Sequence, residues 1–179
     1  SNLTTVLVGV LMFGFGSVTG IDIFSEEAGF LPSPEEKAKK YNGDTWRVGD
    51  TYLESIGQHE YGVTPLQLTR ATGAIATRGA LVRPSLIAQR GHESQRTDMS
   101  IPEEHFKVAQ EGMAYSVENG TAVGLYMHDL SVSAKTGTAE VGGEKEFIHS
   151  WITGYFPRTE PRYAFTIMLE AGPWGEEVG

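Results

Sequence analysis

Four consecutive residues, Lys135-Thr136-Gly137-Thr138, carry the groups of this chain that are best suited to bind an anion. The lysine supplies a positive charge, and the two hydroxyl groups can donate hydrogen bonds to the same ligand. Gly137 leaves the backbone open, because it has no side chain that would hold a bound peptide away from the strand. The pattern predicts a strand that offers a cation, two hydroxyls and a backbone N–H to an anionic, peptide-like ligand.

The segments around this tetrapeptide have the pattern of β-strands. We expect strands over residues 131–136, 148–156 and 163–170, because apolar and small residues alternate there and short polar turns separate them. Short connections favour antiparallel neighbours. Lys135 is therefore expected on a strand of an antiparallel sheet.

Two helices are expected to cover one face of that sheet. The first runs over residues 65–78, with Thr64 as its N-cap and Gly79 as its terminator. The second begins with a capping box at Ser100 and ends at Gly120, and the polar segment between the helices is expected to be an exposed loop. The fold class is α/β in the broad sense, an α+β arrangement of an antiparallel sheet flanked by helices.

The composition is that of a soluble globular protein. Of 179 residues, 40% are apolar and 21% are charged, and the chain is long enough for one domain with a core. The net charge of −9 argues against a nucleic-acid partner bound through a basic face. Because the chain has no cysteine, disulfides, thiolate nucleophiles and cysteine-based metal sites are excluded, which fits an extracytoplasmic protein.

The apolar stretch at residues 6–15 is shorter than the roughly 20 residues that span a bilayer. We interpret it as a buried helix or strand that is cut off at its front. A metal site is not expected, because His59 and Glu60 are adjacent and have no third ligand at a suitable spacing.

Longer motifs around the tetrapeptide resemble those of the class B penicillin-binding proteins, most closely the elongation-type transpeptidases known as penicillin-binding protein 2. The matching segments occur in the family's order and cover most of residues 13–170. They are Ser-Ile-Gly-Gln at 55–58, Val-Thr-Pro-Leu-Gln-Leu at 63–68, Glu-Asn-Gly-Thr-Ala at 118–122, the Lys-Thr-Gly strand, and the strands at 149–157 and 163–170.

The resemblance implies the transpeptidase fold that penicillin-binding proteins share with β-lactamases, and acyl transfer from a D-Ala-D-Ala stem peptide through a serine ester. It implies that Lys135 places positive charge near the substrate carboxylate and tunes a Ser-x-Asn serine. Thr136 and Thr138 would offer hydroxyls to that carboxylate, beside the open backbone of Gly137. The N–H of Thr138 would form half of an oxyanion hole, a donor typically worth roughly 3 kcal/mol in the transition state.

The family's nucleophile is missing from the sequence. The family activates its serine with a lysine three residues on, one helical turn away, and none of the twelve serines here has such a lysine. Ser1-Asn2 is either the end of a Ser-x-Asn motif or a remnant of an expression tag. We expect residues 1–179 to form a partial, truncated transpeptidase domain that carries the Lys-Thr-Gly strand without the Ser-x-x-Lys helix and is inactive by itself.

The resemblance also implies partners and a location. The partners would be the peptidoglycan stem peptide, β-lactam antibiotics and, through the parent protein, the membrane glycosyltransferase of the elongation machinery. No cofactor is implied. The domain would lie on the extracytoplasmic side, with the parent anchored to the cytoplasmic membrane.

Two alternatives stay open at this point. The chain could be a non-catalytic relic or interaction module that kept the fold and lost the chemistry, and a Ser-x-x-Lys followed by a Ser-x-Asn upstream of Ser1 would argue against that. A β-lactamase or β-lactam sensor shares the Lys-Thr-Gly strand, but the motifs at 55–58 and 63–68 argue against it.

Overall fold

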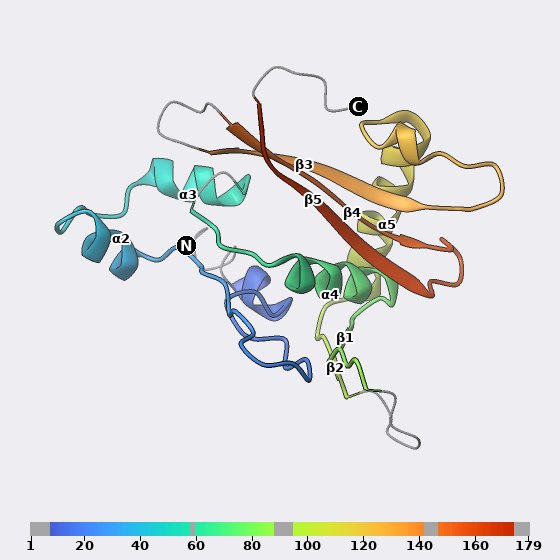
Figure 1. Ribbon diagram of the computed structural model, residues 1–179, viewed down its shortest axis with the longest axis horizontal. Coiled ribbons are helices and arrows are strands. Elements are labelled where there is room, and N and C mark those ends of the chain that lie inside the picture. The colour runs from blue at the N-terminus through green and yellow to red at the C-terminus, as the bar shows by residue number, and fades with distance from the viewer. Residues whose placement is uncertain (1–7, 58–59, 88–94, 142–146, 174–179) are drawn as a thin grey trace.

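The computed structural model describes residues 8–57, 60–87, 95–141 and 147–173 (Figure 1). The three long strands form one antiparallel sheet in the order β3-β4-β5, and helices flank it, as predicted. The elements in chain order are α2 (Pro34–Lys40), α3 (Val48–Ser55), α4 (Pro65–Ala76), β1 (Ala80–Val82), β2 (Arg96–Asp98), α5 (Glu103–Asn119), the 3-10 helix η1 (Val123–Leu125), β3 (Ser133–Val141), β4 (Phe147–Phe156) and β5 (Tyr163–Pro173).

The strand that carries the tetrapeptide lies at one edge of this sheet. β3 pairs with β4 from Ser133 to Val141, with Lys135 opposite Thr153 and Gly137 opposite Trp151. The predicted strand of residues 131–136 therefore begins two residues later and continues five residues further. The Lys-Thr-Gly sequence lies inside the strand and not at its end.

Helix α4 begins where the sequence predicts. Thr64 accepts a hydrogen bond from the N–H of Gln67, whose side chain accepts one from the N–H of Thr64, so a complete capping box forms. The helix ends at Ala76, two residues before the predicted end, because Arg78 and Gly79 both adopt positive φ values of 58° and 116°. The φ of 58° at Arg78 lies in the left-handed helical region, but the 116° at Gly79 is open only to glycine without strain, so Gly79 is the terminator that we expected.

The predicted start of α5 is wrong in its detail. The N-cap is Pro102, which provides no side-chain hydrogen bond, and Ser100 lies two residues before this N-cap. The end at Gly120 is confirmed. The helix buries an apolar face that includes Phe106, Met113 and Val117.

Two segments differ from what the sequence predicts, one near the N-terminus and one between α4 and α5. Residues 8–12 are helical, but Val8 and Leu11 are 49% and 53% exposed, so this part of the apolar stretch is not the buried element that we predicted. The polar segment between α4 and α5 contains β2, which pairs antiparallel with β1 and is exposed along its length. Among the helices of the described residues, none has the length and hydropathy needed to cross a bilayer.

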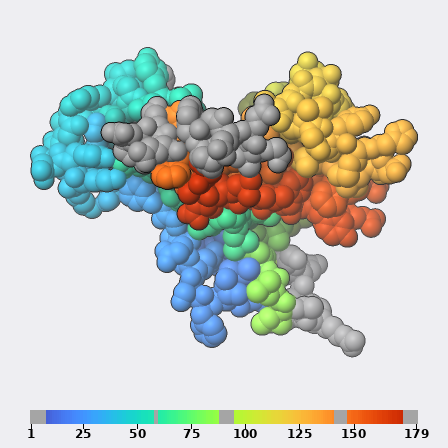
Figure 2. Space-filling view, turned by 45° about the horizontal axis from the view of Figure 1, so that its top comes forward, coloured from blue at the N-terminus to red at the C-terminus, as the bar shows by residue number. Residues whose placement is uncertain are grey.

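Both long helices lie against the face of the sheet that carries Tyr155. This side chain is fully buried in a cluster with Ala76 of α4 and Met113 of α5. Thr153, two residues away on the same face, contacts Thr72 of α4. Figure 2 shows the segment with α2 and α3 (cyan) and the segment leading from α5 to β3 (yellow) on either side of the strands.

Gln67 joins three segments that are far apart in the sequence. Its side chain is 1% exposed, and its Nε2 donates to the carbonyl oxygens of Ser17 and Ala28, each at 2.8 Å. Its Oε1 accepts from the N–H of Thr64 at 3.0 Å. The amide group thus holds the N-terminal loops against the first turn of α4.

We predict that Gln67→Met lowers the free energy of unfolding by about 2–4 kcal/mol, because the carbonyl oxygens of Ser17 and Ala28 and the N–H of Thr64 lose their hydrogen bonds to this buried amide group. Urea denaturation followed by circular dichroism measures this difference. Gln95→Met is the matched control, since Gln95 is exposed and its side chain accepts a surface hydrogen bond from Arg83. Its expected effect is within about 0.5 kcal/mol, and equal losses for both variants would contradict this role of Gln67.

Candidate active site

The four residues of the tetrapeptide lie together on the accessible edge strand. Lys135, Gly137 and Thr138 are exposed, and Thr136 is half-buried. The Nζ of Lys135 donates to the carbonyl oxygen of Thr136 at 2.7 Å. An ammonium group has three N–H donors, so Lys135 can still donate to a ligand that lies along the strand.

Thr136 has a hydroxyl partner that the sequence analysis did not identify. Its Oγ1 lies 2.5 Å from the Oγ1 of Thr121, in the turn that follows α5. Thr121 belongs to the Glu-Asn-Gly-Thr-Ala motif, but nothing in that motif indicates a contact with a strand fifteen residues further on. The hydroxyl groups near Lys135 therefore come from two separate segments.

Two glycines of the sheet have different reasons to be glycine. A Cβ on Gly137 would meet only the Cβ of Trp151, at the ordinary contact distance of 3.7 Å, so the fold leaves room for a side chain there. A Cβ on Gly154 would lie 2.6 Å from the carbonyl oxygen of Ser133 and 2.9 Å from the Cβ of Ala134. Packing requires glycine at Gly154 and does not require it at Gly137.

Three threonines, one each on α4, β4 and β5, contact one another next to the pairing of β3 with β4 at Lys135. Thr153, directly opposite Lys135, has its Oγ1 2.6 Å from that of Thr72 on α4 and 2.9 Å from that of Thr166 on β5. It also donates to the carbonyl oxygen of Phe165 at 3.0 Å. These contacts attach the centre of the sheet to α4, which restricts how β4, and with it β3, can move.

The serine nearest to Lys135 in the sequence, Ser133, is not available as a nucleophile. Ser133 is fully buried, and its partner across the strands is the buried Tyr155. A nucleophile must reach the reacting carbonyl of its substrate, so Ser133 is a core residue. This agrees with its spacing of two residues from the lysine.

His149 and Trp151 lie further along β4, on the same face as Thr153. The Nδ1 of His149 accepts a hydrogen bond from the N–H of Ala171 at 3.0 Å, and the ring is half-buried. The irregular pairing of β4 with β5 occurs at this point, between Ile148 and Ser150. His149 therefore fixes a bulge of the sheet. His59 lies outside the described residues.

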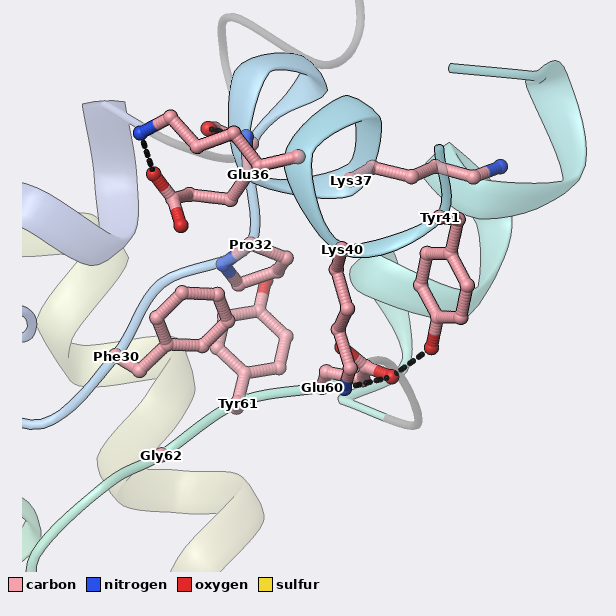
Figure 3. A pocket seen from close by; sticks show the side chains of 11 residues that line it. Phe30, Pro32, Glu36, Lys37, Lys40, Tyr41, Glu60, Tyr61 and Gly62 are labelled. Carbon is pink, nitrogen blue, oxygen red and sulfur yellow. Dashed lines mark hydrogen bonds and ion pairs between the residues drawn. The ribbon is translucent and has the colours of Figure 1, made fainter. Parts of the chain in front are cut away.

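A separate cavity of about 700 Å³ lies between α2 and residues 60–62 (Figure 3). The side chains of Lys40 and Tyr41 both point at the carboxylate of Glu60, which pairs with the lysine at 2.8 Å and accepts a hydrogen bond from the tyrosine. None of the lining residues belongs to the sheet. We therefore place the candidate active site at β3 and not at this cavity.

Comparison with known proteins identifies the family of this chain. The family model for the penicillin-binding protein transpeptidase domain matches residues 4–178. The chain belongs to this family. It is 30% identical to the peptidoglycan D,D-transpeptidase MrdA of Acinetobacter baumannii over 185 residues, which cover 91% of this chain and 27% of that protein. The MrdA of Escherichia coli K12 is also 30% identical, over 93% of this chain and 30% of its own length.

Solved structures of the family have the same fold. Penicillin-binding protein 2 of Helicobacter pylori, in a complex with MreC, matches with a TM-score of 0.81 and 34% identity, over 94% of this chain and 32% of that chain. The Pseudomonas aeruginosa protein, in a complex with WCK 5153, matches with a TM-score of 0.79 and 29% identity, over 92% of this chain and 38% of that chain. The resemblance to penicillin-binding protein 2 is therefore confirmed, and the chain spans less than a third of the length of these two MrdA relatives.

We predict that replacing each of the two glycines with alanine changes the free energy of unfolding by very different amounts. Gly154→Ala should lower the free energy of unfolding by about 1–3 kcal/mol, because the new methyl group overlaps the neighbouring strand. Gly137→Ala should change it by no more than about 0.5 kcal/mol, because its methyl group has space. Urea denaturation of both variants gives the comparison, and a large loss for Gly137→Ala would mean that packing requires this glycine too.

Proposed function

We propose that this chain is the part of a peptidoglycan D,D-transpeptidase domain that binds the terminal carboxylate of a stem peptide. In this proposal Lys135 pairs with the carboxylate, and the hydroxyls of Thr136 and Thr138 donate to it. Gly137 lets the peptide backbone approach the strand. The backbone N–H of Thr138 stabilises the oxyanion of the tetrahedral intermediate.

One observation carries the proposal: Gly137 lies between two threonines and two residues after an exposed lysine, at a position where the fold would accept a Cβ. A strand is more stable without glycine, because glycine loses more conformational freedom when the chain folds. A glycine that packing does not require therefore points to the close approach of a ligand backbone. The exposed edge strand and the family membership support the same role.

The chemical step needs groups that this sequence does not contain. In the proposed reaction a lysine takes the proton of a serine hydroxyl, whose oxygen bonds to the carbonyl carbon of the penultimate D-Ala. The peptide bond to the terminal D-Ala then breaks, and the lysine returns the proton to the amine that leaves. The amine of a second stem peptide displaces the serine from the acyl-enzyme. The 179 residues contain no Ser-x-x-Lys motif. We propose that the nucleophile and base belong to another part of the transpeptidase domain, and that residues 1–179 bind without reacting.

The proposal includes a location and partners. Peptidoglycan is assembled outside the cytoplasmic membrane, so the strand would face the extracytoplasmic side, in a parent protein anchored to that membrane. β-Lactam antibiotics, which present a carboxylate beside a reactive carbonyl, would occupy the same strand. A membrane glycosyltransferase of the elongation machinery is the proposed partner of the parent protein. The relatives' names and the complex of the Helicobacter pylori protein with MreC support this setting.

We predict that the chain binds N-acetyl-D-Ala-D-Ala in preference to the same dipeptide with a C-terminal amide. Lys135→Met should weaken binding of the acid by about tenfold or more, because a charge-assisted hydrogen bond is lost, and should leave the amide unaffected. Titrations followed by nitrogen-15 NMR measure both affinities.

The matched control for this titration is Lys107→Met, which removes an exposed lysine of α5 that pairs with Glu103. It should leave binding of both dipeptides unchanged. Equal affinity of the chain for the acid and the amide would contradict the proposed carboxylate site.

We predict that a fluorescent penicillin forms no covalent adduct with this chain, because no serine has the activating lysine. The intact mass before and after denaturation should be unchanged by incubation with the penicillin. A stable adduct would show that a serine within residues 1–179 is the nucleophile, and the division of roles proposed above would be wrong.

A further inference from the structure

The contact between Thr121 and Thr136 constrains the hydroxyl that lies beside Lys135. The two Oγ1 atoms are 2.5 Å apart, so one hydroxyl donates its proton to the other. Each threonine hydroxyl has a single proton and can donate only once. The direction of this one hydrogen bond therefore decides whether the Thr136 proton is available to a ligand.

The two directions have opposite consequences for an anion. If Thr136 donates to Thr121, the oxygen of Thr136 presents only lone pairs to the strand edge, and these repel a carboxylate. If Thr121 donates to Thr136, the proton of Thr136 can be donated to the carboxylate. Hydrogen bonds in such a chain polarise one another, so the donation from Thr121 strengthens the donation from Thr136.

The residues on either side of Thr121 hold it in place. The N–H groups of the residues on either side of it, Gly120 and Ala122, both donate to the carbonyl oxygen of Ser116 at 3.1 Å. Ala122 is 2% exposed and packs in a cluster with Val132 and Ala134 at the start of β3. The turn is therefore fixed both to the last turn of α5 and to the strand that carries Thr136.

The turn itself needs a glycine for this placement. A Cβ on Gly120 would lie 2.9 Å from the Cα and 3.0 Å from the carbonyl oxygen of Ser116. Beside it, Glu118 of α5 pairs with Arg158 at 2.6 Å, and Arg158 also donates to the carbonyl oxygen of Val132 at 3.4 Å. These contacts link the end of α5 to the start of β3 and so help to hold Thr121 beside Thr136.

We propose that Thr121 is a positioning residue for carboxylate binding: by donating to Thr136 it turns the Thr136 proton toward the ligand. The inference rests on the proposed function, because it takes the ligand to be a peptide carboxylate beside Lys135. It adds a residue of the α5–β3 turn that acts through Thr136 and does not itself touch the ligand.

The test measures the affinity of the full 179-residue chain for N-acetyl-D-Ala-D-Ala and for its C-terminal amide in three variants. Thr121→Val removes the hydroxyl and keeps the shape, and Thr121→Ser restores it. Thr97→Val makes the same exchange at an exposed threonine of β2. Nitrogen-15 NMR spectra of each variant report whether the fold is retained and give the affinities from the same titration.

The expected result is that Thr121→Val weakens binding of the acid by about three- to tenfold. Thr121→Ser and Thr97→Val should stay within about twofold of the unmodified chain, and binding of the amide should not change. The rescue by serine separates a donated hydrogen bond from the loss of packing. If Thr121→Val binds the acid as the unmodified chain does, the inference is wrong while the proposed function stands.

Two other outcomes would also decide the matter. If Thr121→Val weakens the acid and the amide equally, the residue acts on the fold and not on the carboxylate, and the inference is wrong. If the unmodified chain does not distinguish the acid from the amide, the proposed carboxylate site fails, and the inference fails with it.

Discussion

The arrangement of the sheet depends on the close approach of its strands at Gly154. The carbonyl oxygen of Ser133 and the ring of Phe165 occupy the space where a side chain would be, 2.6 Å and 2.8 Å from the position of a Cβ. β3 can therefore lie tightly against β4 in a single register, with Lys135 opposite Thr153. Because one shift in register would turn Lys135 to the other face, the orientation of the candidate site follows from this contact.

Helix α4 connects that sheet to the rest of the chain through buried polar groups. On one side Thr72 contacts Thr153 in the middle of the sheet, and on another Gln67 binds the carbonyl oxygens of two N-terminal loops. Buried polar groups are costly when they lose their partners. These contacts therefore specify one position of α4 against the sheet. Apolar packing by small residues such as Ala76 would by itself permit several positions.

The candidate site combines groups of different origin on one accessible strand edge. Lys135 brings a cation to a chain with a net charge of −9, so the attraction for an anion is local and short-range. Gly137 gives access to the backbone, and Thr136 is held by Thr121 from the turn after α5. In the proposed function these residues hold a carboxylate, a role that needs no nucleophile of their own.

The sequence by itself determined the local features: the Lys135 strand, its antiparallel neighbours, the cap of α4 at Thr64 and the family. Each depends on residues close together in the chain, where propensity and spacing are informative. Only the tertiary structure decided that Ser100 caps nothing, that Gly154 and not Gly137 is required by packing, and that Thr121 meets Thr136. The distances that settle those questions join segments distant in the sequence, and no local pattern encodes them.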